Sequence, residues 1–181
     1  RPGQLHALFN PLFDRSDNLV SCWMAREEMR SDFVLLNGDT VFEPELLQRL
    51  LASRGFPVTV AVDGKARYDA DDMKVRRAGR RLLAIGKDLS AAEANAESVG
   101  ALIFRGEGPQ LFRDALERAM QGSDASSLWY PSAIAELARQ GVVGTVSVDG
   151  LGWAEIDSPE DLATASRLVE SWTAPAAVAA G

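Results

Sequence analysis

The stretch DFVLLNGDTVF, residues 32–42, decides the fold class, because an apolar run ends abruptly there at Asn-Gly-Asp. The run Phe33–Asn37 is short and continuous, which predicts a strand buried on both faces, as in a parallel sheet. In open α/β sheets, ligands bind at the carboxyl ends of the strands. Asp39 therefore follows a strand where a ligand would bind, and Gly38 has no side chain to block a close approach.

Strands and helices alternate along the rest of the chain. Strands are predicted at residues 58–63, 98–104 and 142–150, and helices at 18–29, 43–55, 108–122, 126–141 and 158–172. The exception is the segment 73–89, which turns at Ala78-Gly79 and is typical of a hairpin. The predicted class is α/β, with a mixed, mostly parallel sheet flanked by helices and a small antiparallel insert. Residues 1–172 form one predicted domain, and residues 173–181 a disordered tail.

Composition excludes several classes of function. The net charge of −7 argues against a nucleic-acid partner, and no apolar run approaches the roughly 18 residues of a membrane span. The single cysteine, Cys22, allows no intrachain disulfide and predicts a reducing, cytoplasmic compartment. With His6 as the one histidine, a Ser-His-Asp or Cys-His hydrolase and a zinc site are both disfavoured.

A second acidic group could join Asp39. In WAEIDSPEDL, residues 153–162, Glu155 and Asp157 share one face if the segment is extended. Mg²⁺ binds one or two protein carboxylates together with substrate phosphates, so Asp39 with Asp157 or Glu155 would meet its needs. A single aspartate at the end of a strand is more commonly a turn or cap residue, and spacing alone leaves that alternative open.

Five segments together resemble the nucleotidyltransferases of the sugar-phosphate and phosphocholine cytidylyltransferase type. In order, they are LNGDTVFEPELLQRLLAS at 36–53, YDADDMKV at 68–75, IGKDL at 85–89, ESVGALIF at 97–104 and GWAEIDSPEDL at 152–162. The likeness covers nearly the whole chain. It implies a GT-A-like, Rossmann-related fold that binds Mg²⁺, a nucleoside triphosphate and a phosphorylated acceptor.

The resemblance also implies roles for particular residues. Asp39 would be a catalytic metal ligand, with Asp157 favoured as the second ligand and Glu155 as the alternative. Lys74 would be a catalytic residue near the phosphates or the acceptor. Substrate contacts are expected from Asn37 and Gly38, and from the nucleotide segment DNLVS through Asn18 and Ser21.

The acceptor site is predicted from aromatic and acidic residues. Aromatic faces beside carboxylates can hold a quaternary ammonium group such as choline, and the candidates are Tyr68, Trp129, Tyr130 and Trp153, with Asp69, Asp71 and Asp72. Since Trp129 and Tyr130 are adjacent, one of them is expected to face the site. The alternative is core packing for the tryptophans and a solvated acidic loop. Glu97 would contact the acceptor, hold an amine, or be a charge at a strand edge.

One family feature is not found in residues 1–181. The family opens with a glycine-rich loop whose backbone N–H groups hold the triphosphate. The resemblance therefore implies an N-terminal truncation, a lost loop, or a loop supplied by another chain, with truncation favoured. The sheet edge or core face left uncovered would favour self-association.

Three functional hypotheses follow. The favoured one is a transferase that moves a nucleotidyl group, CMP from CTP in particular, to a small phosphorylated or phosphonate acceptor such as phosphocholine, with release of pyrophosphate. A sugar-1-phosphate nucleotidyltransferase is a close variant, and a non-catalytic truncated remnant of the fold is the second hypothesis. A glycosyltransferase is the third, although that class would want an Asp-x-Asp where this chain has Asn37 and Asp39.

Overall fold

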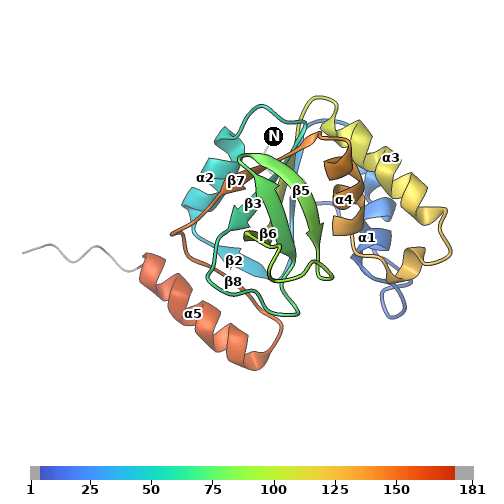
Figure 1. Ribbon diagram of the computed structural model, residues 1–181. Helices are drawn as coiled ribbons and strands as arrows, with labels where there is room; N and C mark the ends of the chain where they lie inside the picture. The colour runs from blue at the N-terminus through green and yellow to red at the C-terminus, as the bar shows by residue number, and fades with distance from the viewer. Residues whose placement is uncertain (1–4, 174–181) are drawn as a thin grey trace, which may run out of the picture.

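The structure is a computed structural model that describes residues 5–173, and it contains two sheets flanked by helices (Figure 1). The larger sheet has the strand order β1-β6-β3-β7-β5-β4. Its strands are β1 Phe33–Leu36, β3 Val58–Asp63, β4 Lys74–Ala78, β5 Arg81–Gly86, β6 Ala96–Phe104 and β7 Val143–Ser147. The smaller sheet pairs β2 Thr40–Phe42 with β8 Trp153–Glu155 in antiparallel register.

Helices cover both faces of the larger sheet. They are α1 Asn18–Met24, α2 Pro44–Ala52, α3 Gly108–Met120, α4 Pro131–Arg139 and α5 Pro159–Thr173, with short 3₁₀ turns η1 Arg26–Glu28 and η2 Ala125–Ser127. Figure 1 shows α1, α3 and α4 grouped on one side, α2 on the other, and α5 beside β2 and β8. Proline opens α2, α4 and α5, where its missing N–H costs no helical hydrogen bond.

The core is divided by the alternation of side chains along β3 and β6. Val58, Val60 and Val62 point into the larger cluster, under α3 and α4, whereas Ala61 faces the smaller cluster with Leu46 and Leu50 of α2. Every residue of β6 is buried. β6 is therefore the central strand around which both layers pack.

The mixed sheet is confirmed, but the prediction that it is mostly parallel is wrong. Among the strands described, β3–β7 is the one parallel pairing. β6 runs opposite to both of its main neighbours, β1 and β3, and the β4–β5 hairpin is antiparallel as predicted. Continuous apolar runs such as 98–104 indicate burial on both faces, and helices on both sides of the sheet produce that burial whatever the strand direction.

β1 differs from its prediction in burial. It pairs with β6 alone, so it lies at an edge of the sheet, and Leu36 is 45% exposed. The prediction of burial on both faces is therefore wrong for this strand. Apart from Thr173, which ends α5, the predicted tail 173–181 lies outside the described residues. None of the helices within residues 5–173 is long and apolar enough to span a membrane.

Candidate active site

The two acidic segments meet through the smaller sheet. Thr40 pairs with Glu155 across the β2–β8 ladder, and the backbone N–H of Ile156 donates to the carbonyl oxygen of Asp39 at 2.9 Å. Residues more than a hundred positions apart are thereby placed side by side. The carboxylates of Asp39, Glu155 and Asp157 all line one cavity of about 670 Å³.

The opposite wall of this cavity comes from α1, the end of β1 and the segment before α4. Four predicted substrate residues lie here besides Asn37: Asn18, Ser21, Trp129 and Tyr130. Both neighbouring aromatic residues line the cavity, so the expectation that one would do so is wrong. Trp129 and Tyr130 come just before Pro131, the first residue of α4. They therefore lie outside the regular helix in which adjacent side chains would point in different directions.

Tyr130 connects the elements of this wall. Its hydroxyl donates to Asn37 Oδ1 at 3.0 Å, and its backbone N–H donates to Asn18 Oδ1 at 2.8 Å. Asn37 also lies against Gly100, whose φ is +71° and where an added Cβ would come within 2.5 Å of Asn37 Nδ2. Only glycine fits at that position without displacing Asn37. The amides of Asn18 and Asn37 are thus held in place by buried neighbours.

Negative charge dominates the cavity. Partial desolvation raises the pKa of Glu155, which remains solvent-accessible, and the nearby charges of Asp39 and Asp157 raise it further. Lys87 opposes them by lowering the same pKa. Burial also raises the pKa of Tyr130, so its hydroxyl stays protonated as the hydrogen-bond donor to Asn37.

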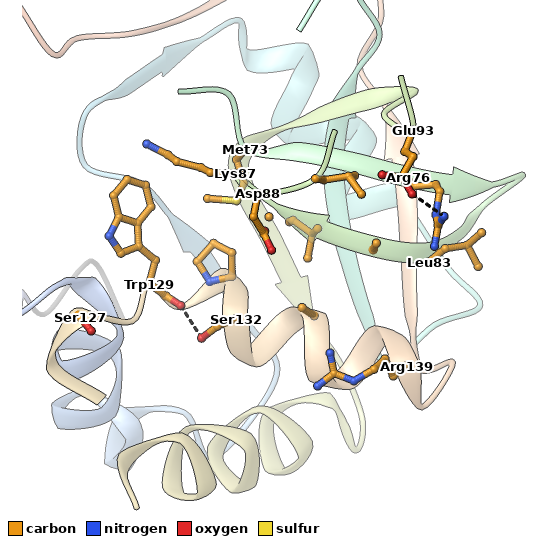
Figure 2. Close-up of a pocket in the computed structure, with 16 residues that line it drawn as sticks. Met73, Arg76, Leu83, Lys87, Asp88, Glu93, Ser127, Trp129, Ser132 and Arg139 are labelled. Carbon is orange, nitrogen blue, oxygen red and sulfur yellow. Dashed lines mark hydrogen bonds and ion pairs between the residues drawn. The ribbon is translucent and has the colours of Figure 1, made fainter. Parts of the chain in front are cut away.

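Lys87 is a site residue that the sequence analysis did not single out. Its Nζ lies 3.8 Å from the centroid of the Trp129 ring, Figure 2 shows the two side chains next to each other, and both residues line the acid-lined cavity. Lys87 directly follows β5, so the return strand of the hairpin delivers it to the site. The segment IGKDL was already part of the family likeness, and its lysine was the available signal.

Lys74, in contrast, does not line the cavity. Its side chain is buried, with 4% exposed, and Nζ donates to the carbonyl oxygens of Asp69 and Ala70 at 2.8 and 3.2 Å. A third carbonyl, that of Asp72, lies at 3.4 Å. The ammonium group therefore holds the loop before β4, and its predicted contact with phosphate has no support in this geometry.

Glu97 is likewise turned into the protein, at the pairing of β4 with β6. It forms an ion pair with Lys65 at 2.8 Å, and Lys65 also pairs with Asp72 at 2.8 Å. Desolvation raises the pKa of Glu97, and the ammonium of Lys65 limits that rise. Glu97 is thus the buried member of an ion-pair network in which Lys65 is exposed and Asp72 lines the cavity.

Three further predicted residues lie elsewhere. Tyr68 lines a separate cavity beside Lys65, and Trp153 donates its indole N–H to Asp63 Oδ2 at 2.9 Å while packing in the smaller core cluster. Gly38 lines an adjoining cavity of about 590 Å³ that shares Asn37 and Tyr130 with the first. The predicted aromatic cluster is therefore not brought together, and Trp129 and Tyr130 alone of its members reach the site.

The carboxylates do not form a ready-made metal cage. Within residues 5–173, no three histidine, cysteine, aspartate or glutamate side chains converge closely enough to bind a metal ion by themselves. Mg²⁺ does not need such a cage, because it commonly uses one or two carboxylates and completes its octahedron with water and substrate phosphates. The donor set fits Mg²⁺ on those terms.

Sequence comparison finds relatives over most of this chain, although no family model matches it. The bifunctional IPC transferase and DIPP synthase of Rubrobacter xylanophilus is 30% identical over 168 residues, which cover 91% of this chain and 36% of that protein. The CMP-5'-(3-aminopropyl)phosphonate synthase of Streptomyces rubellomurinus is 30% identical over 169 residues, covering 87% of this chain and 26% of that protein. The chain thus spans about a third or less of the length of these curated relatives.

Solved structures share the fold. The inositol-1-phosphate CTP transferase from T. maritima superposes with a TM-score of 0.71 at 20% identity, over 90% of this chain and 65% of that one. The CTP:phosphocholine cytidylyltransferase from Streptococcus pneumoniae gives 0.68 at 15% identity, over 90% and 68%.

The fold is therefore that of the Rossmann-like nucleotidyltransferases. The sequence relatives, among them a CMP-phosphonate synthase, confirm the resemblance drawn from the motifs.

Proposed function

We propose that the chain transfers a nucleotidyl group, CMP from CTP, to a small phosphorylated or phosphonate acceptor and releases pyrophosphate. The observation that carries the proposal is the cavity in which Asp39, Glu155 and Asp157 lie together with Lys87. The names of similar proteins, a CMP-phosphonate synthase and two CTP-using enzymes, support both the nucleotide and the class of acceptor.

The proposed reaction needs few reactive groups from the protein. A phosphate oxygen of the acceptor attacks the α-phosphorus of the triphosphate, a new phosphorus–oxygen bond forms, and the bond to pyrophosphate breaks. A phosphate monoester has a second pKa of about 6 and is largely dianionic at neutral pH. It therefore needs no general base, and catalysis depends on positioning and charge neutralisation.

Charge neutralisation is the main requirement of this site. Lys87 is the one basic residue among the described residues that line the cavity, whereas six acids line it: Asp17, Asp39, Asp71, Asp72, Glu155 and Asp157. A free triphosphate would be repelled by such a surface. We therefore propose that Mg²⁺ binds at Asp39 with Asp157, or with Glu155, and neutralises the phosphates when the nucleotide is present.

The same charges suggest how an acceptor with an amine would be oriented. Lys87 is the candidate to bind its phosphate or phosphonate group, while Asp71 provides negative charge for its ammonium group, since Asp72 is already paired with Lys65. The face of Trp129 is already covered by Lys87 at 3.8 Å. Recognition of the ammonium group would therefore rest on carboxylates more than on an aromatic cage.

A substrate matrix tests the proposal. The natural protein that carries this chain is incubated with CTP, UTP, ATP or dTTP, each paired with phosphocholine, an aminoalkylphosphonate, inositol-1-phosphate or glucose-1-phosphate, and pyrophosphate release is measured with and without Mg²⁺. We expect Mg²⁺-dependent release with CTP and a non-sugar acceptor. Preference for glucose-1-phosphate with UTP or dTTP would indicate a sugar-1-phosphate enzyme, and no release with any pair would indicate a non-catalytic remnant.

A further inference from the structure

A groove of about 830 Å³ continues from the candidate active site between the β4–β5 hairpin and α4 (Figure 2). It shares Met73, Lys87, Trp129 and Pro131 with the acid-lined cavity. The two spaces are therefore adjoining parts of one depression, and a molecule held at Lys87 can extend into the groove.

The floor of the groove is apolar and partly open to solvent. Leu83 and Ile85 contribute from β5 and Ala135 from α4, and the exposed fractions of Leu83 and Trp129 are 38% and 37%. α4 runs from Pro131 to Arg139, which is eight steps of 1.5 Å, so the groove beside it is about 12 Å long. A short acceptor bound at Lys87 would leave most of this surface empty.

Positive charge returns at the end of the groove far from Lys87. Arg76 lies there in an ion pair with Glu93, Nη1 to Oε1 at 3.4 Å. Arg139, in the last turn of α4, has no ion-pair partner among the described residues, and Figure 2 shows its guanidinium reaching back along α4 beside the groove. The groove thus has a cation at each end, with Asp88 next to Lys87, Glu93 paired with Arg76, and apolar side chains from β5 and α4 between the two ends.

We propose that this groove binds the distal part of an extended acceptor, which consists of an apolar spacer and a terminal anionic group held by Arg139. This inference rests on the proposed function and specifies its acceptor class. Burial of the spacer would cover Leu83 and Trp129, which are otherwise exposed apolar side chains. The planar guanidinium of Arg139 suits a carboxylate or phosphate by paired hydrogen bonds.

The test compares two alkyl phosphates of equal length, long enough to span about 12 Å, one ending in a carboxylate and the other in a methyl group. Each is assayed with CTP in the natural protein, and the ratio of their kcat/KM values is the readout. We expect the carboxylate-ended phosphate to have the higher kcat/KM. Arg139→Gln should lower the ratio of the two kcat/KM values about fivefold, which is the size expected for loss of a solvent-exposed ion pair. Arg167→Gln, an exposed arginine on α5, is the matched control and should leave the ratio unchanged.

A second variant tests the apolar floor separately. Leu83→Asn should lower kcat/KM for both long acceptors relative to phosphocholine, because the spacer loses its apolar contact. Equal use of the two long acceptors, or a ratio unchanged by Arg139→Gln, would overturn the inference. Conversion of phosphocholine without any conversion of the long acceptors would overturn it and leave the proposed function intact, whereas no transfer to any acceptor would overturn both. A concentration-dependent dimer that Leu83→Glu dissociates would show a second copy in the groove and also overturn it.

Discussion

Replacing Tyr130 by phenylalanine should loosen the wall of the candidate active site. The side chain is 4% exposed, and its hydroxyl donates to Asn37 Oδ1 at 3.0 Å. Phenylalanine keeps the ring and its packing but removes the donor. Asn37 Oδ1 then loses its hydrogen bond in a partly buried position beside Gly100.

The expected cost follows from that single bond. Leaving a buried acceptor without its donor costs about 1–2 kcal/mol of unfolding free energy. For a domain of this size, each kcal/mol lowers the melting temperature by about 2–4 °C, so a fall of about 2–8 °C is expected. Because Asn37 and Asn18 are predicted to contact substrate, KM for CTP should rise more than kcat falls.

Thermal unfolding followed by circular dichroism measures the first effect, and steady-state pyrophosphate release the second. Tyr68→Phe is the matched control, because the Tyr68 hydroxyl accepts one long bond of 3.4 Å from the Lys65 backbone and lies outside the cavity. If Tyr130→Phe melted at the wild-type temperature, or no lower than Tyr68→Phe, the proposed role of this hydrogen bond would be refuted.

Two further predictions concern the carboxylates. Asp39→Asn and Asp157→Asn should each lower kcat by about 10²-fold or more, because each removes a proposed Mg²⁺ ligand; wild-type turnover in either variant would contradict that ligand's assignment. In Glu155→Gln the melting temperature should rise at pH 7 without metal, since the raised pKa of Glu155 means that its ionised form is disfavoured in the folded protein. The gain should disappear as the pH falls below the ordinary glutamate pKa of 4.5, where the carboxyl is protonated in both states; a gain that persists at lower pH would exclude this electrostatic cause. A large loss of turnover in Glu155→Gln would make Glu155, in place of Asp157, the second metal ligand.

The sequence predicted the acidic pair better than it predicted the sheet. The need of a hard cation for oxygen ligands that lie together predicts Asp39 with Asp157 or Glu155, and the β2–β8 ladder does bring all three to one cavity. Strand direction depends on which strands pair, and the apolar run of β6 contains no information on that choice. The run therefore predicted burial correctly and parallel pairing wrongly.

The lysines show a second limit. Both Lys74 and Lys87 lie at the ends of hairpin strands, and local sequence cannot tell which ammonium group faces inward. Lys74 finds backbone carbonyls within its own loop, whereas Lys87 extends over Trp129. The difference arises from the backbone path of residues 69–73, a tertiary feature without a periodic pattern.

Lys74 and Glu97 nevertheless contribute to the site through that loop. A buried ionic group is strongly unfavourable unless it is paired, so Lys74 needs the carbonyls of Asp69 and Ala70 while Glu97 needs Lys65. Lys65 in turn holds Asp72. These contacts specify one path for the loop, and that path places Asp71, Asp72 and Met73 in the wall of the acid-lined cavity. Residues that the family resemblance assigned to direct substrate contact thus shape the cavity from behind its wall, through the loop that they hold in place.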